Sequence, residues 1–430
     1  MIPILEFDKL SSEEILNRDI RAEANVDAAV DAVLAEVRAN GDAALKAYTK
    51  RFDGVELDAL QVTSEEIGAA WASLDPDFIT TLEMAAENIR HFHEQQVHKD
   101  FVLTDKPGIL MGQRYTPIEK VGICVPRSPE AFPSTVLMNV IPAKIAGVRD
   151  IVVVTPPDKN GSVSPEALAA AKIAGADKIF KVGGAQAVVA LAYGTESVPR
   201  VDKVVGPGGI FVATAKRKVF GQVAIDMIAG PSEILVLADG KSNPRWVAAD
   251  LLSQAEHDVL ASAVLVTDSR ELAEKVQAEL EIQLERLPRR EVARKSVDDN
   301  GKIIVTDSLD KAAEAANRIA PEHLELCVDD PFALLPKIRN AGSIFLGRSA
   351  PEALGDYFAG PNHTLPTSGT ARFSSPLSVD DFVKKSSFLY YDQAALAPVA
   401  ERIADFARRE GLEAHAQSVL IRNEEGGNAL

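Results

Sequence analysis

Short apolar runs that alternate with helical segments limit the fold of this sequence more than any other feature. Residues 151–157, IVVVTPP, form an apolar run that ends at two prolines, and residues 165–175, PEALAAAKIAG, follow with helical spacing. The alternation continues to about residue 220 and begins again at EILVLAD, residues 233–239. Apolar strands joined through helices form parallel sheets covered on both faces, so the two blocks predict two such globules.

We predict an α/β fold with two Rossmann-like, doubly wound domains of mainly parallel strands, a helical N-terminal segment and an extended or helical C-terminal segment. A chain of 430 residues is long enough for two or three domains. The expected parts are residues 1–20 as an N-terminal arm, 21–126 with 233–375 as the first globule, 127–232 as the second globule, and 376–430 as a C-terminal tail domain.

Composition excludes several classes of protein. The chain has 63 acidic and 46 basic residues, and its net charge of −17 disfavours contact with nucleic acids or anionic lipids. Cys124 and Cys327 are the only cysteines, which excludes a disulfide framework. The sequence also shows no secretion signal at its start and no apolar stretch of membrane-spanning length. We therefore expect a cytoplasmic protein that binds neither nucleic acid nor membranes.

Glycine-rich turns follow the predicted strands at residues 182–187, 205–211 and 228–233. Glycine lets the backbone approach a phosphate group, and a helix that follows offers free N–H groups. None of these turns is a complete G-x-G-x-x-G motif, since Phe211 occupies the place of the third glycine in the second turn. The turns fit a nucleotide site, and they fit ordinary strand–helix connections equally well.

Four of the seven histidines lie beside acidic or amide residues, in the second half of the chain: His257, His323, His363 and His415. One such histidine most often makes a structural hydrogen bond, but four of them favour a shared polar site. The other three, His91, His93 and His98, lie in a polar helical stretch and are expected to face solvent.

A metal site is one interpretation of these histidines. Gln254 and His257 lie three residues apart on a predicted helix, so their side chains point from one face. Asp356, in the irregular segment 351–378, and His415 are plausible further ligands. An amide, a carboxylate and imidazoles suit Zn²⁺ or a similar ion with open positions for a substrate, although spacing alone leaves this assignment open.

Glu322 and His323 form the candidate catalytic pair. Pro321 precedes them, and a turn there would let both side chains reach one site. A carboxyl group and an imidazole at one site can serve two separate proton transfers, as a two-step reaction requires.

Five longer motifs resemble the histidinol dehydrogenase family, from about residue 25 to residue 422: GQVAIDMIAGPSEILVLAD, AADLLSQAEHD, ANRIAPEHLEL, EALGDYFAGPNHTLPTSGTARFSSPLSV and EGLEAHAQSVLIR. The resemblance implies a zinc-dependent, NAD-linked, four-electron oxidation of L-histidinol to L-histidine through L-histidinal, at the end of histidine biosynthesis. It also implies a homodimer of Rossmann-like subunits, in which the C-terminal segment reaches the active site of the partner subunit.

The resemblance gives roles to individual residues. The implied metal ligands are Gln254, His257, Asp356 and His415, and the implied catalytic residues are Glu322 and His323. The implied substrate contacts are Ser232, Gln254, His257, His323, Asp356, His363, Glu410 and His415. Glu410 and His415 would act in the active site of the partner subunit.

The implied cofactor contacts are Cys124, Gln186 and Gly209, and two of them depart from the family pattern. Cys124 and Gly209 stand where the family usually has tyrosine and asparagine, and Arg127 and Ser128 replace two glycines. Arg127 offers a phosphate contact that would favour NADP over NAD. An active enzyme that holds its cofactor differently is favoured over a paralogue with weakened cofactor use, because the metal residues are all present.

Two alternative functions remain open at this point. One is a related zinc dehydrogenase with a different alcohol or cofactor. The other is a zinc hydrolase without a nicotinamide cofactor, in which Glu322 activates a water molecule bound to the metal ion. A binding or scaffold protein without catalysis would leave the pair of Glu322 and His323 unexplained.

Overall fold

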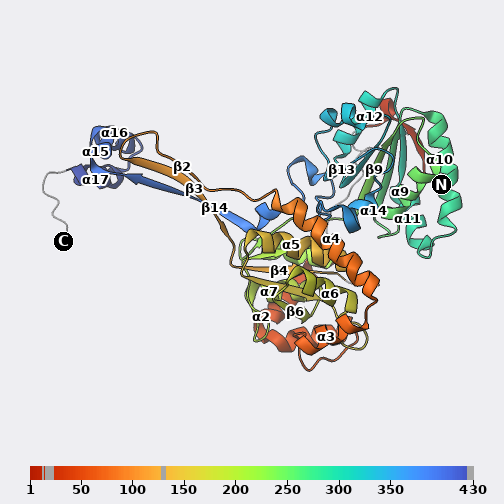
Figure 1. Ribbon diagram of the computed structural model, residues 1–430, viewed down its shortest axis with the longest axis horizontal. Helices are drawn as coiled ribbons and strands as arrows, with labels where there is room; N and C mark the ends of the chain where they lie inside the picture. The colour runs from red at the N-terminus through yellow and green to blue at the C-terminus, as the bar shows by residue number, and fades with distance from the viewer. Residues whose placement is uncertain (12–13, 15–23, 127–131, 424–430) are drawn as a thin grey trace. The chain divides into compact units, whose positions relative to one another are not determined.

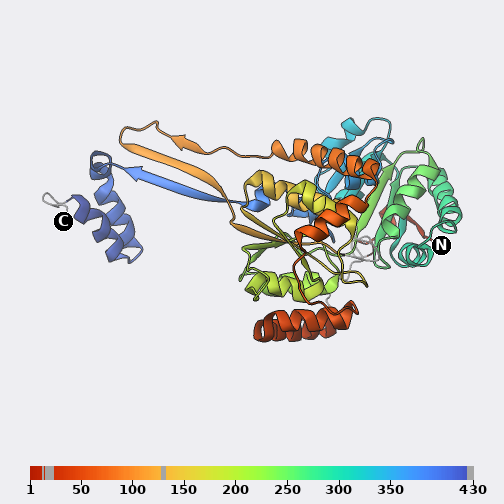
Figure 2. The ribbon, with the colours of Figure 1, turned by 60° about the horizontal axis from the view of Figure 1, so that its bottom comes forward.

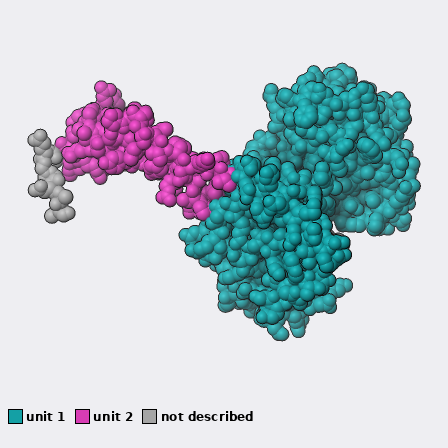
Figure 3. All heavy atoms as spheres, viewed as in Figure 1, with its two compact units in different colours: residues 1–96, 118–382 teal, residues 97–117, 383–430 magenta. Residues whose placement is uncertain are grey.

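The computed structural model describes residues 1–11, 14, 24–126 and 132–423, which form two units (Figure 3). The first unit comprises residues 1–96 and 118–382, and the second comprises residues 97–117 and 383–430. Two parallel sheets form the first unit, and an antiparallel sheet with short helices forms the second (Figure 1). Across these described ranges, no helix is long and apolar enough to cross a membrane.

The first sheet has six parallel strands in the order β1-β11-β10-β9-β12-β13. The strands are β1 (Ile4–Glu6), β9 (Glu233–Ala238), β10 (Ser262–Thr267), β11 (Lys302–Val305), β12 (His323–Cys327) and β13 (Ser343–Leu346). Every residue of β9 is buried, because helices cover both faces of the sheet. The helices α9 (Pro244–Ala255), α10 (Arg270–Leu284) and α11 (Arg290–Asn300) pack on one face, and α12 (Leu309–Ile319) packs on the other. The order, which runs outward from β9 in both directions, is that of a doubly wound domain.

The second sheet has five parallel strands in the order β6-β5-β4-β7-β8. They are β4 (Lys120–Cys124), β5 (Asp150–Thr155), β6 (Lys178–Lys181), β7 (Lys203–Val205) and β8 (Ala224–Ile225). The helices α5 (Pro133–Ala146) and α6 (Pro165–Ala174) pack in one core cluster, and α7 (Gly184–Tyr193) and α8 (Ile210–Val219) pack in the other. The predicted α/β class with two doubly wound parallel sheets is therefore confirmed.

The predicted assignment of residues 21–126 to the first globule is wrong. The helices α2 (Ala24–Phe52), α3 (Ser64–Ser73) and α4 (Pro76–Glu94) contact α5 to α8 around the second sheet (Figure 1). Residues 120–124 are a central strand of that same sheet, and residues 4–6 of the predicted arm form an edge strand of the first sheet. The apolar face of a helix shows that the helix packs on a sheet, but it does not show on which sheet.

The second unit is built around a long antiparallel ribbon (Figure 2). It contains β2 (Phe101–Leu103), β3 (Ile109–Pro117) and β14 (Val383–Tyr391), in the order β14-β3-β2. The helices α15 (Gln393–Leu396), α16 (Ala400–Arg409) and α17 (Glu413–Leu420) follow, and their small core consists mainly of alanines. The predicted tail domain of residues 376–430 therefore lacked β2 and β3, which supply two of the three strands of this sheet. The unit exposes large apolar side chains, such as Leu389, Phe406 and Ile421.

A segment without strands, Pro351 to Phe382, links the two sheets of the first unit. It contains α14 (Glu352–Leu354), the π-helix η3 (Gly355–Ala359) and two short 3₁₀ turns. The Asn362 side chain donates a hydrogen bond to the carbonyl of Met138 in α5 at 2.6 Å, while the Ser368 N–H donates to the carboxylate of Glu233 in β9 at 3.1 Å. The segment therefore contacts elements of both globules.

His93, which was expected to face solvent, is completely buried at the end of α4. Its Nδ1 lies 2.7 Å from Gln96 Oε1, which also accepts the N–H of Val379. Because this amide oxygen can only accept, His93 must donate from Nδ1. The prediction for His93 was wrong, whereas His91 and His98 are exposed as expected.

Candidate active site

The candidate catalytic residues lie at the amino edge of the first sheet. His323 is the first residue of β12, and it pairs in register with Ile234 at the start of the neighbouring strand β9. Ligands of doubly wound sheets usually bind at the carboxyl edge. In this chain the carboxyl edge of the first sheet has a hollow of about 660 Å³, lined by Asp239, Asp268 and Asp329 among others, which contains none of the predicted site residues.

A backbone turn brings Glu322 and His323 to one site. Ala320, at the end of α12, has a φ of 51°, and this left-handed conformation redirects the chain before β12. Glu322 Oε2 accepts the N–H of Glu233 at 2.8 Å and lies 3.6 Å from His323 Nδ1. His323 Nδ1 lies 2.9 Å from the Glu233 carbonyl oxygen and therefore donates to it, which leaves Nε2 for proton transfer.

Burial and neighbouring charges shift the pKa values of this pair. Burial raises the pKa of Glu322 to about 8, with Glu233 and Asp356 adding to the shift. Burial lowers the pKa of His323, but the carboxylates of Glu322, Asp356 and Glu352 outweigh it and raise the value to about 10. A bound cation would disfavour the protonated forms of Glu322 and His323 and would lower both pKa values.

Several buried polar atoms next to this pair have no hydrogen-bond partner among the described residues. They include Gln254 Nε2, His323 Nε2 and Glu352 Oε1. His323 Nε2 lies 3.8 Å from Glu352 Oε1 and 3.8 Å from Asp356 Oδ1. Buried polar groups are normally satisfied, so the unpaired His323 Nε2 and Glu352 Oε1 beside the Asp356 carboxylate fit a divalent cation.

The residues predicted as ligands within the first unit gather here. Gln254 is buried in the last turn of α9, and His257 follows directly after that helix, with its N–H bonded to the Gln254 carbonyl at 3.1 Å. Burial lowers the pKa of His257, while the nearby charge of Asp356 raises it in part. A neutral imidazole, an amide and a carboxylate are a donor set that suits Zn²⁺.

Asp356 lies on the π-helix η3, a rare conformation that is frequent at functional sites. Burial raises its pKa, but the neighbouring imidazoles of His323 and His363 outweigh burial and hold the pKa well below its usual value. His363 is oriented by the same residue, with its Nδ1 3.1 Å from the Asp356 carbonyl oxygen. Burial lowers the pKa of His363, while the nearby charge of Asp356 raises it in part.

Glu352 is a site residue that the sequence interpretation missed. It is 3% exposed and lies beside His323 and Asp356, and the donor atoms of these three residues all lie within 4.8 Å of one another. Its Oε2 accepts a hydrogen bond from Ser253 at 3.2 Å. The spacing of Glu352 and Asp356, four residues apart as on one helical face, was the signal that could have found it.

The remaining predicted substrate residues lie in different places. Ser232 is half-buried directly before β9, next to Glu233. Glu410, at the end of α16, and His415, in α17, belong to the second unit and are exposed there.

The predicted cofactor residues follow the carboxyl ends of strands in the second sheet. Cys124 ends β4, Gln186 is buried in α7 after β6, and Gly209 caps the start of α8 after β7. Burial raises the pKa of the Cys124 thiol to about 12, so it is not a nucleophile. This edge is the usual nucleotide position in such folds. Arg127 and Ser128 lie outside the described residues.

The glycine-rich turn after β7 is held by a buried ion pair. Lys216 pairs with Asp226, and its Nζ also donates to the Gly206 carbonyl at 2.9 Å. Asp226 Oδ2 accepts the N–H of Gly206 at 2.8 Å. Gly206 has a φ of 104°, and a Cβ there would meet the carbonyl oxygen of Cys124. The pair therefore positions the turn that leads to Gly209.

Comparison with known proteins identifies the family of this chain. A family model described as histidinol dehydrogenase matches residues 16–423. The chain is 53% identical to the histidinol dehydrogenase of Clostridium acetobutylicum, over 98% of this chain and 99% of the relative. It is 55% identical to that of Geobacillus kaustophilus, over 92% and 93% of the two chains. The crystal structure of histidinol dehydrogenase from Elizabethkingia anophelis matches with a TM-score of 0.92 and 38% identity, over 98% of this chain and 97% of the other. The chain therefore belongs to the histidinol dehydrogenase family, as its motifs predicted.

Proposed function

We propose that this chain oxidises L-histidinol to L-histidine through L-histidinal, in two NAD-linked steps at a zinc site. The proposed ligands are Gln254, His257 and Asp356, together with the partner's His415 in a homodimer. Membership of the family makes the chain an oxidoreductase of histidine biosynthesis. The observation that supports the zinc site is the set of unpaired buried atoms beside the pair of Glu322 and His323.

The two catalytic residues would move protons at stated atoms. His323 Nε2 would take the alcohol proton in the first oxidation and a proton of the hydrated aldehyde in the second, since Nδ1 is engaged by the Glu233 carbonyl oxygen. Glu322 would take a proton from the water that adds to the aldehyde. When bound, Zn²⁺ would orient the substrate through its imidazole and amine, and NAD would accept the electrons.

The positions of the predicted cofactor residues support NAD binding at the carboxyl edge of the second sheet, through Gln186 and the turn before Gly209. Because Cys124 and Gly209 depart from the family pattern, the preference for NAD or NADP has to be measured. Kinetics with both cofactors, before and after Arg127→Gly, test that choice. A preference for NADP that survives Arg127→Gly would refute the proposed role of Arg127.

Turnover of the zinc-loaded enzyme tests the proposed activity directly. L-Histidinol and NAD should yield two reduced cofactors for each L-histidine formed. Absence of reduction with either cofactor would refute the activity and favour the zinc hydrolase. A cytoplasmic location and the absence of nucleic-acid and membrane partners remain predictions.

Complementation tests the shared active site. Glu322→Gln and His415→Asn homodimers should each be impaired, but each heterodimer should contain one intact site. An equal mixture allowed to exchange subunits should regain about one quarter of wild-type activity, since half the dimers are mixed and each has one good site. A mixture that gains nothing after exchange would argue against the contribution of His415 to the partner subunit.

A further inference from the structure

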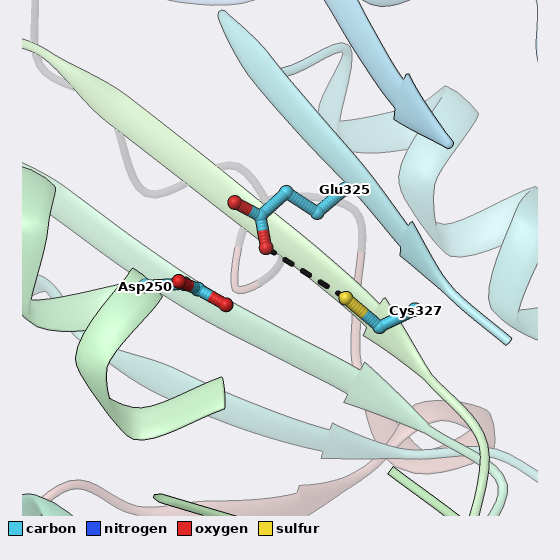
Figure 4. Close-up of side chains that lie close together, drawn as sticks. All are labelled: Asp250, Glu325 and Cys327. Carbon is cyan, nitrogen blue, oxygen red and sulfur yellow. Dashed lines mark hydrogen bonds between the residues drawn. The ribbon is translucent and has the colours of Figure 1, made fainter. Parts of the chain in front are cut away.

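Two carboxyl groups and a thiol, those of Asp250, Glu325 and Cys327, lie close together (Figure 4), and Glu325 and Cys327 are buried. His323, Glu325 and Cys327 alternate along β12 and share one face of the strand. Glu325 is fully buried. Asp250 approaches it from α9, one helical turn before Gln254.

The contacts of this group reach three structural elements. Glu325 Oε1 accepts the N–H of Glu352 at 2.8 Å, and Glu352 starts the helix that continues to Asp356. Glu325 Oε2 accepts the thiol of Cys327 at 3.7 Å. Carboxyl oxygens of Asp250 and Glu325 and the sulfur of Cys327 lie within 4.8 Å of one another. Glu325 thus bonds to the start of the segment that carries Asp356 and lies close to the helix that carries Gln254.

The chemistry of the group favours a shared proton over a metal ion. Burial raises the pKa of both Asp250 and Glu325, and the charge of Asp250 raises that of Glu325 further. Burial likewise raises the pKa of the Cys327 thiol, whereas a thiol must lose its proton to bind a metal ion. Within the described chain, none of the buried polar atoms without a partner belongs to these three residues.

We propose that Asp250 and Glu325 are a positioning pair, which holds α9, β12 and the Glu352–Ala359 segment in register around the metal site. The inference rests on the proposed zinc site, which it deepens. The close approach of the Asp250 and Glu325 carboxyl groups joins the helix of Gln254 to the strand of His323. The hydrogen bond from the Glu352 N–H to Glu325 joins that strand to the start of the segment that carries Asp356. Buried residues that orient ligands in this way tune metal affinity without touching the ion.

Zinc affinity of the full chain, measured by competition with a chromogenic chelator, tests the pair. In Glu325→Met the Glu352 N–H and Asp250 lose their partner, and zinc affinity should fall by about 10–100-fold. The double variant Asp250→Leu/Glu325→Met leaves no unpaired charge, so its melting temperature should stay near that of wild type. Its zinc affinity and kcat should nevertheless fall as in the single variant, which a merely structural role would not produce.

A conservative variant and a matched control complete the design. Glu325→Gln keeps the acceptor for Glu352 and can donate to Asp250, so its zinc affinity should stay within about threefold of wild type. Leu326→Met alters the opposite face of β12 and should change neither zinc affinity nor kcat.

Three results would overturn the inference. The first is a double variant that binds zinc as tightly as wild type. The second is a zinc affinity of Glu325→Gln that falls as much as that of Glu325→Met. The third is a wild-type chain with two zinc ions, one of which is lost in Cys327→Ser. A wild-type chain without zinc affinity would instead overturn the proposed zinc site itself, and the inference with it.

Discussion

The buried ion pair between Lys216 and Asp226 predicts a large loss of stability when one partner is removed. The Lys216 side chain is 2% exposed and that of Asp226 is 0% exposed, so water solvates neither charge. Asp226 also accepts the N–H groups of Gly206 at 2.8 Å and Met227 at 2.7 Å. Asp226→Ala leaves the buried Lys216 charge without a counter-charge and two backbone N–H groups without an acceptor, and we expect the free energy of unfolding to fall by about 3–5 kcal/mol.

Unfolding in guanidinium chloride, followed by tryptophan fluorescence, measures this loss. Trp71 packs against the core of the second sheet, and Trp246→Phe would leave it as the only tryptophan. In that background, Lys216→Met/Asp226→Leu removes both charges and should stay within about 1 kcal/mol of the parent.

The two variants separate charge from packing. A double variant as unstable as Asp226→Ala would refute the reasoning from unpaired charge. Asp226→Ala should also raise the KM for NAD more than the KM for histidinol, because the pair holds the turn that leads to Gly209. Equal changes in both KM values would refute that link.

Further outcomes concern the catalytic and metal residues. Glu322→Gln should slow oxidation of the aldehyde by roughly 10²–10⁴-fold and that of the alcohol far less; equal slowing in rapid-quench experiments would contradict its role. His257→Asn should lose zinc on dialysis, and unchanged zinc content would remove it from the ligand set. Gly206→Ala should unfold at lower denaturant concentration, because its φ of 104° strains alanine; an unchanged midpoint would show that the turn relaxes. In the zinc-free protein the pKa of His323 is raised from 6.5 to about 10, so its contribution to stability is full below pH 6.5 and is lost as the pH rises through 10. The melting temperature should fall across this range, and His323→Asn should flatten the profile; an equal fall in both proteins would contradict the assignment.

The two sheets could be predicted because their strands are buried on both faces. In β9 every residue is buried, so the strand is a continuous apolar run that the sequence displays directly. The placement of α2 to α4 could not be predicted, since an apolar helix face does not identify its partner. His93 shows the same limit, because its partners Gln96 and Asn362 include a residue 269 positions away.

Site residues that stand in long family motifs could be predicted from the sequence. Residues that join the site only through tertiary contacts could not. Gln254, His257 and Asp356 stand in motifs that resemble the family, and the fold brings them to one place. Glu352 and Glu325 were missed, because an acidic residue in a helix or strand normally faces water. Only the packing of α9 and β12 shows that these two are buried.

Of the proposed substrate residues, Ser232 and His323 lie at the starts of strands of the first sheet, whereas the proposed cofactor residues lie at or after the ends of strands of the second sheet. Substrate binding and cofactor binding would therefore depend on separate sets of loops. Replacing Cys124 by tyrosine and Gly209 by asparagine should retune the choice of electron acceptor and leave metal chemistry untouched. Evolution could have altered one loop set in the same way, while the other set stayed intact.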